Sequence, residues 1–89
     1  MSRYKKPNWA VKIIRKQDWD NYYIKDPNYS YLGEVSYNGR RRVLIGFMTF
    51  LSEQEIASNP ELLLPTPEQL KLIDVDRKSK NMRPYPLEN

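Results

Sequence analysis

The sequence has no cysteine and no histidine among its 89 residues. Without cysteine the chain forms no disulfide and holds no thiol nucleophile, which argues against a small secreted scaffold stapled by disulfides. Without histidine it lacks the commonest general base and the commonest metal ligand of proteins. We therefore expect a protein that is not an enzyme and that binds no metal and no cofactor.

Glycine is also scarce, and long apolar segments are absent. The three glycines are isolated, so neither a P-loop nor a dinucleotide-binding fingerprint is present, and no small-molecule substrate is evident. The longest apolar run is Val43–Met48, far short of the ~20 residues that a membrane-spanning helix needs. The first residues show no apolar stretch typical of a secretory signal. We expect a soluble intracellular protein, in the cytoplasm or in an organellar matrix.

Aromatic residues are missing from positions 51–84, whereas ten of the eleven lie in the first 50. Basic residues follow the same distribution, since residues 1–45 carry ten of the fifteen Lys and Arg but only four acidic side chains. Residues 46–89 carry five basic and seven acidic side chains. The chain therefore has a basic, aromatic front half, and a positive field of this kind attracts nucleic acid or acidic protein surfaces.

The length allows one small domain with a modest core. We predict a basic flexible arm over residues 1–8, a single domain over residues 9–80 and an extended, proline-containing tail over residues 81–89. Within the domain, Trp9–Lys16 alternates apolar and basic residues as a strand does. After a polar break, Tyr22–Ile24 is predicted as a short second strand.

The strongest local signal is a hairpin over Tyr29–Leu51. Its centre, Asn38-Gly39, is a preferred two-residue turn, because both turn positions need a positive φ. Counting outward from this turn gives the register of the two strands and divides their side chains between two faces. One face carries an aliphatic set that would seed the core: Leu32, Val43, Ile45 and Phe47. The other face carries an aromatic and basic set: Tyr29, Tyr31, Tyr37, Arg40 and Arg42.

Two capping-box patterns predict short helices in the second half of the chain, within Ser52–Leu64 and near Pro67–Leu72. The second pattern has Pro67 at the first helical position, where proline is favoured. For residues 70–77 both a helical face and an alternating strand fit the sequence. We favour a helical turn that leads into a strand.

These elements together indicate an α+β or mostly β fold. We predict a small antiparallel sheet or partly open barrel of about three to five strands around the Tyr29–Leu51 hairpin. Short helical segments follow it toward the C-terminus, and both tails are extended.

Basic residues interleaved with aromatic ones are the main functional signal. A single-stranded nucleic-acid site needs cations for the phosphates and flat rings on which bases stack. A protein-binding hot spot is rich in the same Tyr, Trp and Arg residues. The candidate partner-binding residues belong to the hairpin, the first strand and the N-terminal arm: Tyr29, Tyr31, Tyr37, Arg40, Arg41, Arg42, Lys12, Lys16, Lys5 and Lys6. Because these residue types also pack in cores, either function requires that the face be exposed.

We expect a small non-catalytic binding protein, and two functions are open. In the first, an accessory or modulator protein docks on a larger protein complex through the Tyr/Arg-rich face and its extended termini. The alternative is a single-stranded RNA- or DNA-binding protein that uses the same hairpin face. We rank the nucleic-acid function second, because the back half is acidic and no nucleic-acid-binding motif is present.

Overall fold

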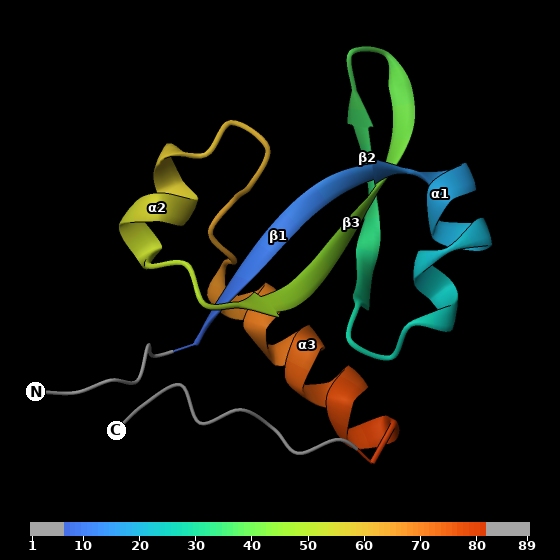
Figure 1. Cartoon of the computed structure of the whole chain (residues 1–89). Coiled ribbons are helices and arrows are strands. Elements are labelled where there is room, and N and C mark those ends of the chain that lie inside the picture. Colours follow the sequence, from blue (N-terminus) through green and yellow to red (C-terminus); the bar gives the residue numbers. More distant parts are fainter. Residues whose placement is uncertain (1–6, 82–89) are drawn as a thin grey trace, which may run out of the picture.

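The hairpin predicted from the Asn38-Gly39 pair is the centre of the fold. In the computed structural model, which describes residues 7–81, β2 (Ser30–Tyr37) and β3 (Arg40–Thr49) are antiparallel and are joined by this two-residue turn (Figure 1). Asn38 and Gly39 have φ values of 52° and 74°, the positive values that such a turn requires. The turn chemistry therefore determines where the two strands reverse.

β1 (Asn8–Arg15) pairs with the other side of β3 and completes the sheet. The sheet has three antiparallel strands in the order β1-β3-β2, and it is open. This confirms a small α+β fold, with the open sheet and not the barrel as its architecture. Trp9, Val11 and Ile13 share one face of β1, as their alternation predicts.

A β-bulge breaks the predicted register of the hairpin between Tyr31 and Gly33. From the turn as far as Gly33 the strands pair as predicted, but Tyr31 then pairs with Ile45 instead of Gly46. Gly33 has a φ of 138°, which a residue with a Cβ rarely adopts, so this glycine admits the extra residue. Apart from that glycine, the bulge leaves no signal in the alternation of the sequence.

The bulge exchanges side chains between the two faces of the sheet. The prediction that Leu32 joins Val43 and Ile45 is wrong, because Leu32 lies on the opposite face, 3.2 Å from where a Cβ on Gly46 would stand. Tyr31, which was expected on that opposite face, instead pairs with Ile45 and shares its face. The core around Val43 and Ile45 is instead completed by β1 and by aromatic side chains of flanking segments: Ile14, Trp19, Tyr23 and Tyr29.

The segment after β1 is helical, so the strand predicted over Tyr22–Ile24 is wrong. The chain forms α1 (Lys16–Asn21) and then a 3-10 helix, η1 (Tyr23–Lys25). An ion pair with i,i+3 spacing supports the first turn, with Arg15 Nε 3.0 Å from an Asp18 carboxylate oxygen. The aromatic residues of this segment cover the sheet instead of extending it.

The second half forms α2 (Glu53–Ser58) and α3 (Pro67–Ser79). Both predicted capping boxes are present, with Ser52 and Thr66 as N-caps. α3 continues for 13 residues, so the strand predicted after its first turn is wrong. The helical period places Ile73 against the sheet, and burial of this face outweighs the strand-like alternation. Among residues 7–81, no helix is both long and apolar enough to cross a bilayer.

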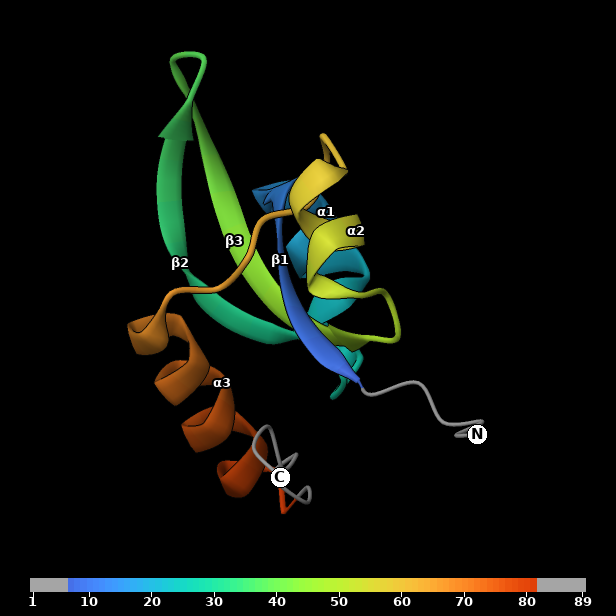
Figure 2. The same ribbon diagram turned by 90° about the vertical axis from the view of Figure 1, so that its left-hand side faces the viewer.

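The helices cover opposite faces of the sheet. Figure 2 shows α3 on one side of the strands and α1 on the other. On the α3 side, Ile73 packs over the backbone of Gly46, and on the α1 side the aromatic residues pack over the centre of β3. The buried apolar side chains come from the sheet and from both later helices: Trp9, Ala10, Val11, Ile14, Val43, Ile45, Ile56 and Ile73.

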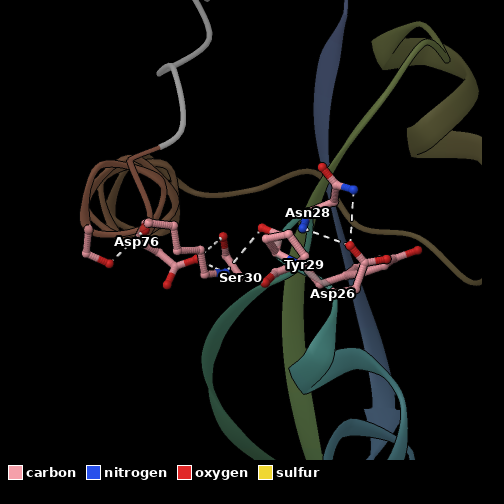
Figure 3. A network of polar contacts seen from close by, with 8 residues as sticks. Asp26, Asn28, Tyr29, Ser30 and Asp76 are labelled. Atoms are coloured by element: carbon pink, nitrogen blue, oxygen red, sulfur yellow. Dashed lines mark hydrogen bonds and ion pairs between the residues drawn. The ribbon is translucent and has the colours of Figure 1, made fainter.

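A polar cluster fastens the end of α3 to the start of β2 (Figure 3). Ser30 is buried, and its hydroxyl donates to an Asp76 carboxylate oxygen at 2.8 Å. Lys80 Nζ lies 2.7 Å from the same carboxylate and donates to the backbone oxygens of Pro27 and Tyr29 at 3.2 and 3.0 Å. These bonds hold α3 against one end of the sheet and leave the hairpin tip beyond it.

Candidate functional site

The structure divides the predicted aromatic and basic face. The prediction that Tyr29 and Tyr31 share a face with Arg42 is wrong, because the β-bulge reverses the alternation and sends both tyrosines to the α1 side. The Tyr29 ring packs edge-on against Tyr23, with centroids 4.8 Å apart, and the Tyr31 ring lies 5.3 Å from Trp19. These two tyrosines therefore pack against aromatic neighbours on the far face.

Three predicted residues lie where the register places them. Tyr37, Arg40 and Arg42 share the face opposite α1, close to the hairpin tip. Arg41 alternates to the α1 side, where its guanidinium lies 3.5 Å from the Glu34 carboxylate. The turn-proximal part of the hairpin therefore keeps one aromatic and two basic side chains of the predicted site on one surface.

The remaining predicted residues have separate positions. Lys16 is in α1 and forms an ion pair with Asp20 at 3.2 Å. Lys12 is in β1, one of the two edge strands of the sheet. Lys5 and Lys6 lie outside the described residues, as does the predicted extended tail beyond residue 81.

An open pocket of about 540 Å³ lies along the outer edge of β1 and the adjoining hairpin. We call it the edge groove, and it is lined by residues of β1, the hairpin and the segment that precedes α3: Lys12, Ile13, Tyr37, Arg42, Pro60, Glu61 and Leu63. The groove brings together three of the predicted site residues, one from each strand of the sheet: Lys12, Tyr37 and Arg42. It is the candidate functional site.

A single β-bridge holds the side of the edge groove that is formed by Pro60, Glu61 and Leu63. The Val11 N–H donates to the Leu63 carbonyl at 2.9 Å, and the Leu63 N–H donates to the Val11 carbonyl at 2.8 Å. Just before it, the Glu61 N–H donates to the Asn59 side-chain oxygen at 2.8 Å, which fixes a turn. This side of the groove is therefore an ordered turn that runs beside β1.

The edge groove combines apolar walls with positive charge. Leu63 is 48% exposed and Tyr37 is 51% exposed, so both side chains present surface to a partner. The Arg42 guanidinium donates to the backbone oxygen of Arg41 at 3.2 Å. No carboxylate of residues 7–81 forms an ion pair with Arg42 or Lys12. Their charges are therefore available to an anionic group from outside.

A further arginine stands next to the groove. Arg15 faces Arg42 across the β1–β3 ladder and bonds to Asp18 through two contacts of 3.0 Å. The hydrogen bond and the attraction of this carboxylate raise the pKa of Arg15 above its ordinary value, so it stays charged. Glu61 is the carboxylate that lines the groove itself. The cations at this surface outnumber the carboxylates, and the local field is positive.

The aspartates of α1 and α3 form ion pairs with basic side chains. Four carboxylates of α1 and α3 each lie within 3.2 Å of a lysine or arginine: Asp18, Asp20, Asp74 and Asp76. Within the part of the chain that the structure describes, no three or more acidic residues gather into a cluster that could hold a metal ion.

Sequence reasoning missed the apolar half of the edge groove. The alternation of β1 assigns Ile13 to a strand face, and the local patterns assign Pro60 and Leu63 to a helical region. The bridge between Val11 and Leu63 joins segments far apart in the chain. A single contact of this kind leaves no periodic or motif signal, so residue patterns cannot reveal it.

The chain matches no protein-family model, no curated protein and no solved structure. Its function is therefore inferred from the residues of the edge groove and their surroundings. The most informative properties of these residues are the exposure of their side chains and their charge, because both are typical of surfaces that bind partners.

Proposed function

We propose that the protein is a non-catalytic, intracellular accessory protein that docks on a larger protein complex through the edge groove. The observation that carries this proposal is the meeting of an exposed tyrosine, available cations and apolar walls in one groove. Tyrosine and arginine are enriched at protein-binding hot spots, where apolar surroundings exclude water from the contact. Tyr37 and Arg42 are the expected anchors, with Lys12 beside them.

Binding of single-stranded nucleic acid has less support than protein docking. Stacking sites present ring faces in succession to consecutive bases. Tyr29 and Tyr31 pack against other rings on the far face, and among the residues that line the edge groove Tyr37 alone is aromatic. Arg40 and Arg42 would still contact phosphates, so RNA and DNA are tested as the alternative ligands.

The test compares two variants that change the net charge and the number of tyrosines equally. The groove variant carries Tyr37→Ser and Arg42→Glu. The control variant carries Tyr22→Ser and Lys25→Glu in the α1–η1 segment, where Tyr22 is 68% exposed. Each variant removes one exposed tyrosine and reverses one cation. The wild type and both variants, as full chains, are immobilised and exposed to a nuclease-treated extract of the cells that make the protein, and the bound proteins are quantified by mass spectrometry.

We expect one set of proteins to bind both the wild type and the control variant. The amount of these proteins bound to the groove variant should be lower by about tenfold or more, because the groove variant lacks the hot spot. Equal recovery from all three proteins would overturn the docking function. In parallel, labelled single-stranded RNA and DNA are titrated by fluorescence anisotropy at two salt concentrations. Tight, steeply salt-dependent binding that the groove variant loses would replace protein docking by nucleic-acid binding.

A further inference from the structure

The outer edge of β1 is only partly paired. In an antiparallel strand the backbone N–H and C=O groups of successive residues point alternately to one side and the other. Val11 points outward, because both of its groups bond to Leu63. The alternation directs the N–H and C=O of Ile13, two residues further on, to the same outer side. Ile13 therefore offers the next donor and acceptor along this edge.

No other segment of residues 7–81 uses the donor and acceptor of Ile13. The bridge to Leu63 is a single pair, and neither a backbone nor a side-chain group of the described residues bonds to the outward side of Ile13. Ile13 itself lines the edge groove, so this unpaired edge forms part of the groove wall. Exposed strand edges of this kind bind extended peptides, which add a strand to the sheet.

We propose that an extended, acidic segment of the partner protein binds in the edge groove as an added strand, hydrogen-bonded to the backbone of Ile13. This inference rests on the docking function proposed above and states how docking takes place. The added strand continues, along β1, the ladder that Leu63 begins at Val11. Its main chain supplies affinity, and the contacts of its alternate side chains with Tyr37 and Arg42 supply specificity.

The charge around the edge groove selects an acidic occupant. Lys12 and Arg42 line the groove without a carboxylate partner among residues 7–81, and they outnumber Glu61, the one acidic residue of its lining. Carboxylates on a strand laid beside β1 come close to these cations, whereas a basic segment is repelled. A nucleic acid also carries negative charge, but it lacks the alternating amide donors and acceptors that pair with a strand edge at Ile13.

The other edge of the sheet, on β2, is less suited to the same occupant. Its ladder is interrupted by the bulge at Gly33, and bulges obstruct the addition of a regular strand. Glu34 is exposed on this strand and already lies 3.5 Å from the Arg41 guanidinium, so an acidic neighbour would compete with Glu34 for this cation. The edge of β1 carries cations at the corresponding place, so the proposal assigns the added strand to β1.

The probe is a displayed library of random peptides of about ten residues, enough for one strand. The full-length protein selects peptides, and an Ile13→Pro variant, which lacks the outward N–H, serves for counter-selection. The sheet is expected to tolerate this proline, because the lost donor does not bond to β3. The matched control is Ser36→Pro, which removes an outward N–H from the β2 edge, and circular dichroism checks that both variants fold.

We expect the enriched peptides to be acidic, and to bind the wild type and Ser36→Pro about tenfold or more tightly than Ile13→Pro. N-methylation of every second amide in the best peptide should weaken binding to the wild type about tenfold, while methylation of the intervening amides should not. This scan uses only the wild-type protein, so it decides the matter even if Ile13→Pro fails to fold.

Strand addition would be overturned if no peptide were enriched or if the enriched peptides had no excess of acidic residues. It would also be overturned if the loss of affinity did not depend on which amides are N-methylated. A wild-type dimer in sedimentation analysis that Ile13→Pro disperses would also overturn it, since a second copy of the chain would then occupy the edge. The docking function is tested separately. Capture from the extract that depends on Tyr37 and Arg42 but persists with Ile13→Pro would support docking and refute the added strand.

Discussion

The two ends of the β2–β3 hairpin differ in how they are covered. At the end near Ser30 and Gly46, which we call the covered end, Ser30 is 1% exposed and Ile73 of α3, packed over Gly46, is also 1% exposed. At the turn end, which we call the open end, Tyr37 is 51% exposed and the Arg41 side chain is 83% exposed. Figure 1 shows the same contrast, with the hairpin tip projecting past the helices.

This difference teaches that stability depends on the covered end of the two strands, whereas the binding that we propose would depend on the open end. Side chains at the covered end bury apolar surface, and in a domain of this size each such contact is a large part of a thin stability margin. Side chains at the open end bury little, so their replacement costs little stability. The open end and the edge groove can therefore specialise in binding, and mutation should separate the two properties.

The largest expected effect contrasts neighbouring residues on the two faces of β3. Val43 is fully buried in the core on the α1 side, and Val43→Asp places an unpaired charge there. We expect a loss of more than about 4 kcal/mol, enough to unfold the domain. Arg42→Asp, one residue away on the groove face, should remain folded. Circular dichroism and thermal melting distinguish the two, and a folded Val43→Asp protein would contradict the face assignment.

Gly46 tests how tightly the covered end is packed. A Cβ at this position would lie 2.7 Å from Cδ1 and 2.9 Å from Cγ1 of Ile73, which is enclosed and has little room to move. We expect Gly46→Ala to lower the free energy of unfolding by about 1–3 kcal/mol. Ile73→Val removes the closest atom, so the double variant should lose less than the sum of the two single losses.

The control for this double-mutant cycle uses a buried residue outside the contact. Ile56 in α2 is fully buried, and Gly46→Ala with Ile56→Val should give losses that add. Urea unfolding measures the free energy of each variant. If the losses of unfolding free energy for Gly46→Ala and Ile73→Val also added, Ile73 would not be packed against Gly46 as the structure has it.

The elements with local signals could be predicted from the sequence. The turn at Asn38-Gly39 and the capping boxes at Ser52 and Thr66 each depend on residues close together in the chain, and all of them form as predicted. Residues 70–77 carry no decisive local signal, because their alternation also fits a strand. These residues form a helix because Ile73 then packs against Gly46. Ile73 and Gly46 are far apart in the sequence, so local patterns do not reveal this contact.

The candidate site could be predicted only in part, for the same physical reason. Tyr37 and Arg42 lie within the register that the turn determines, so their common face follows from the sequence. Tyr31 was misplaced, because one extra residue in a strand reverses every side chain beyond it. Leu63 was missed, because its place beside Val11 depends on a single long-range bridge.

The smallest expected effect concerns Tyr29, on the α1 side of the covered end. Burial, followed by the neighbouring Tyr23 and Asp26, raises the pKa of Tyr29 above its ordinary value of 10.0. The folded state therefore holds this proton more strongly than the unfolded state. The resulting stability is complete below about pH 10 and is lost as the pH rises through the folded pKa.

Replacing Tyr29 by phenylalanine removes the group that titrates and keeps the ring. The free energy of unfolding of Tyr29→Phe should therefore decline less steeply than that of the wild type between about pH 9 and pH 11.5. Near pH 7 the two should be similar, because the hydroxyl forms no hydrogen bond with a described residue. Urea unfolding between pH 7 and about pH 11.5 measures the free energy of unfolding of the wild type and of Tyr29→Phe. If the free energies of unfolding of the two proteins declined in parallel, Tyr29 would ionise as easily in the folded as in the unfolded chain. The Tyr29 hydroxyl would then be exposed to solvent and not buried with the covered end.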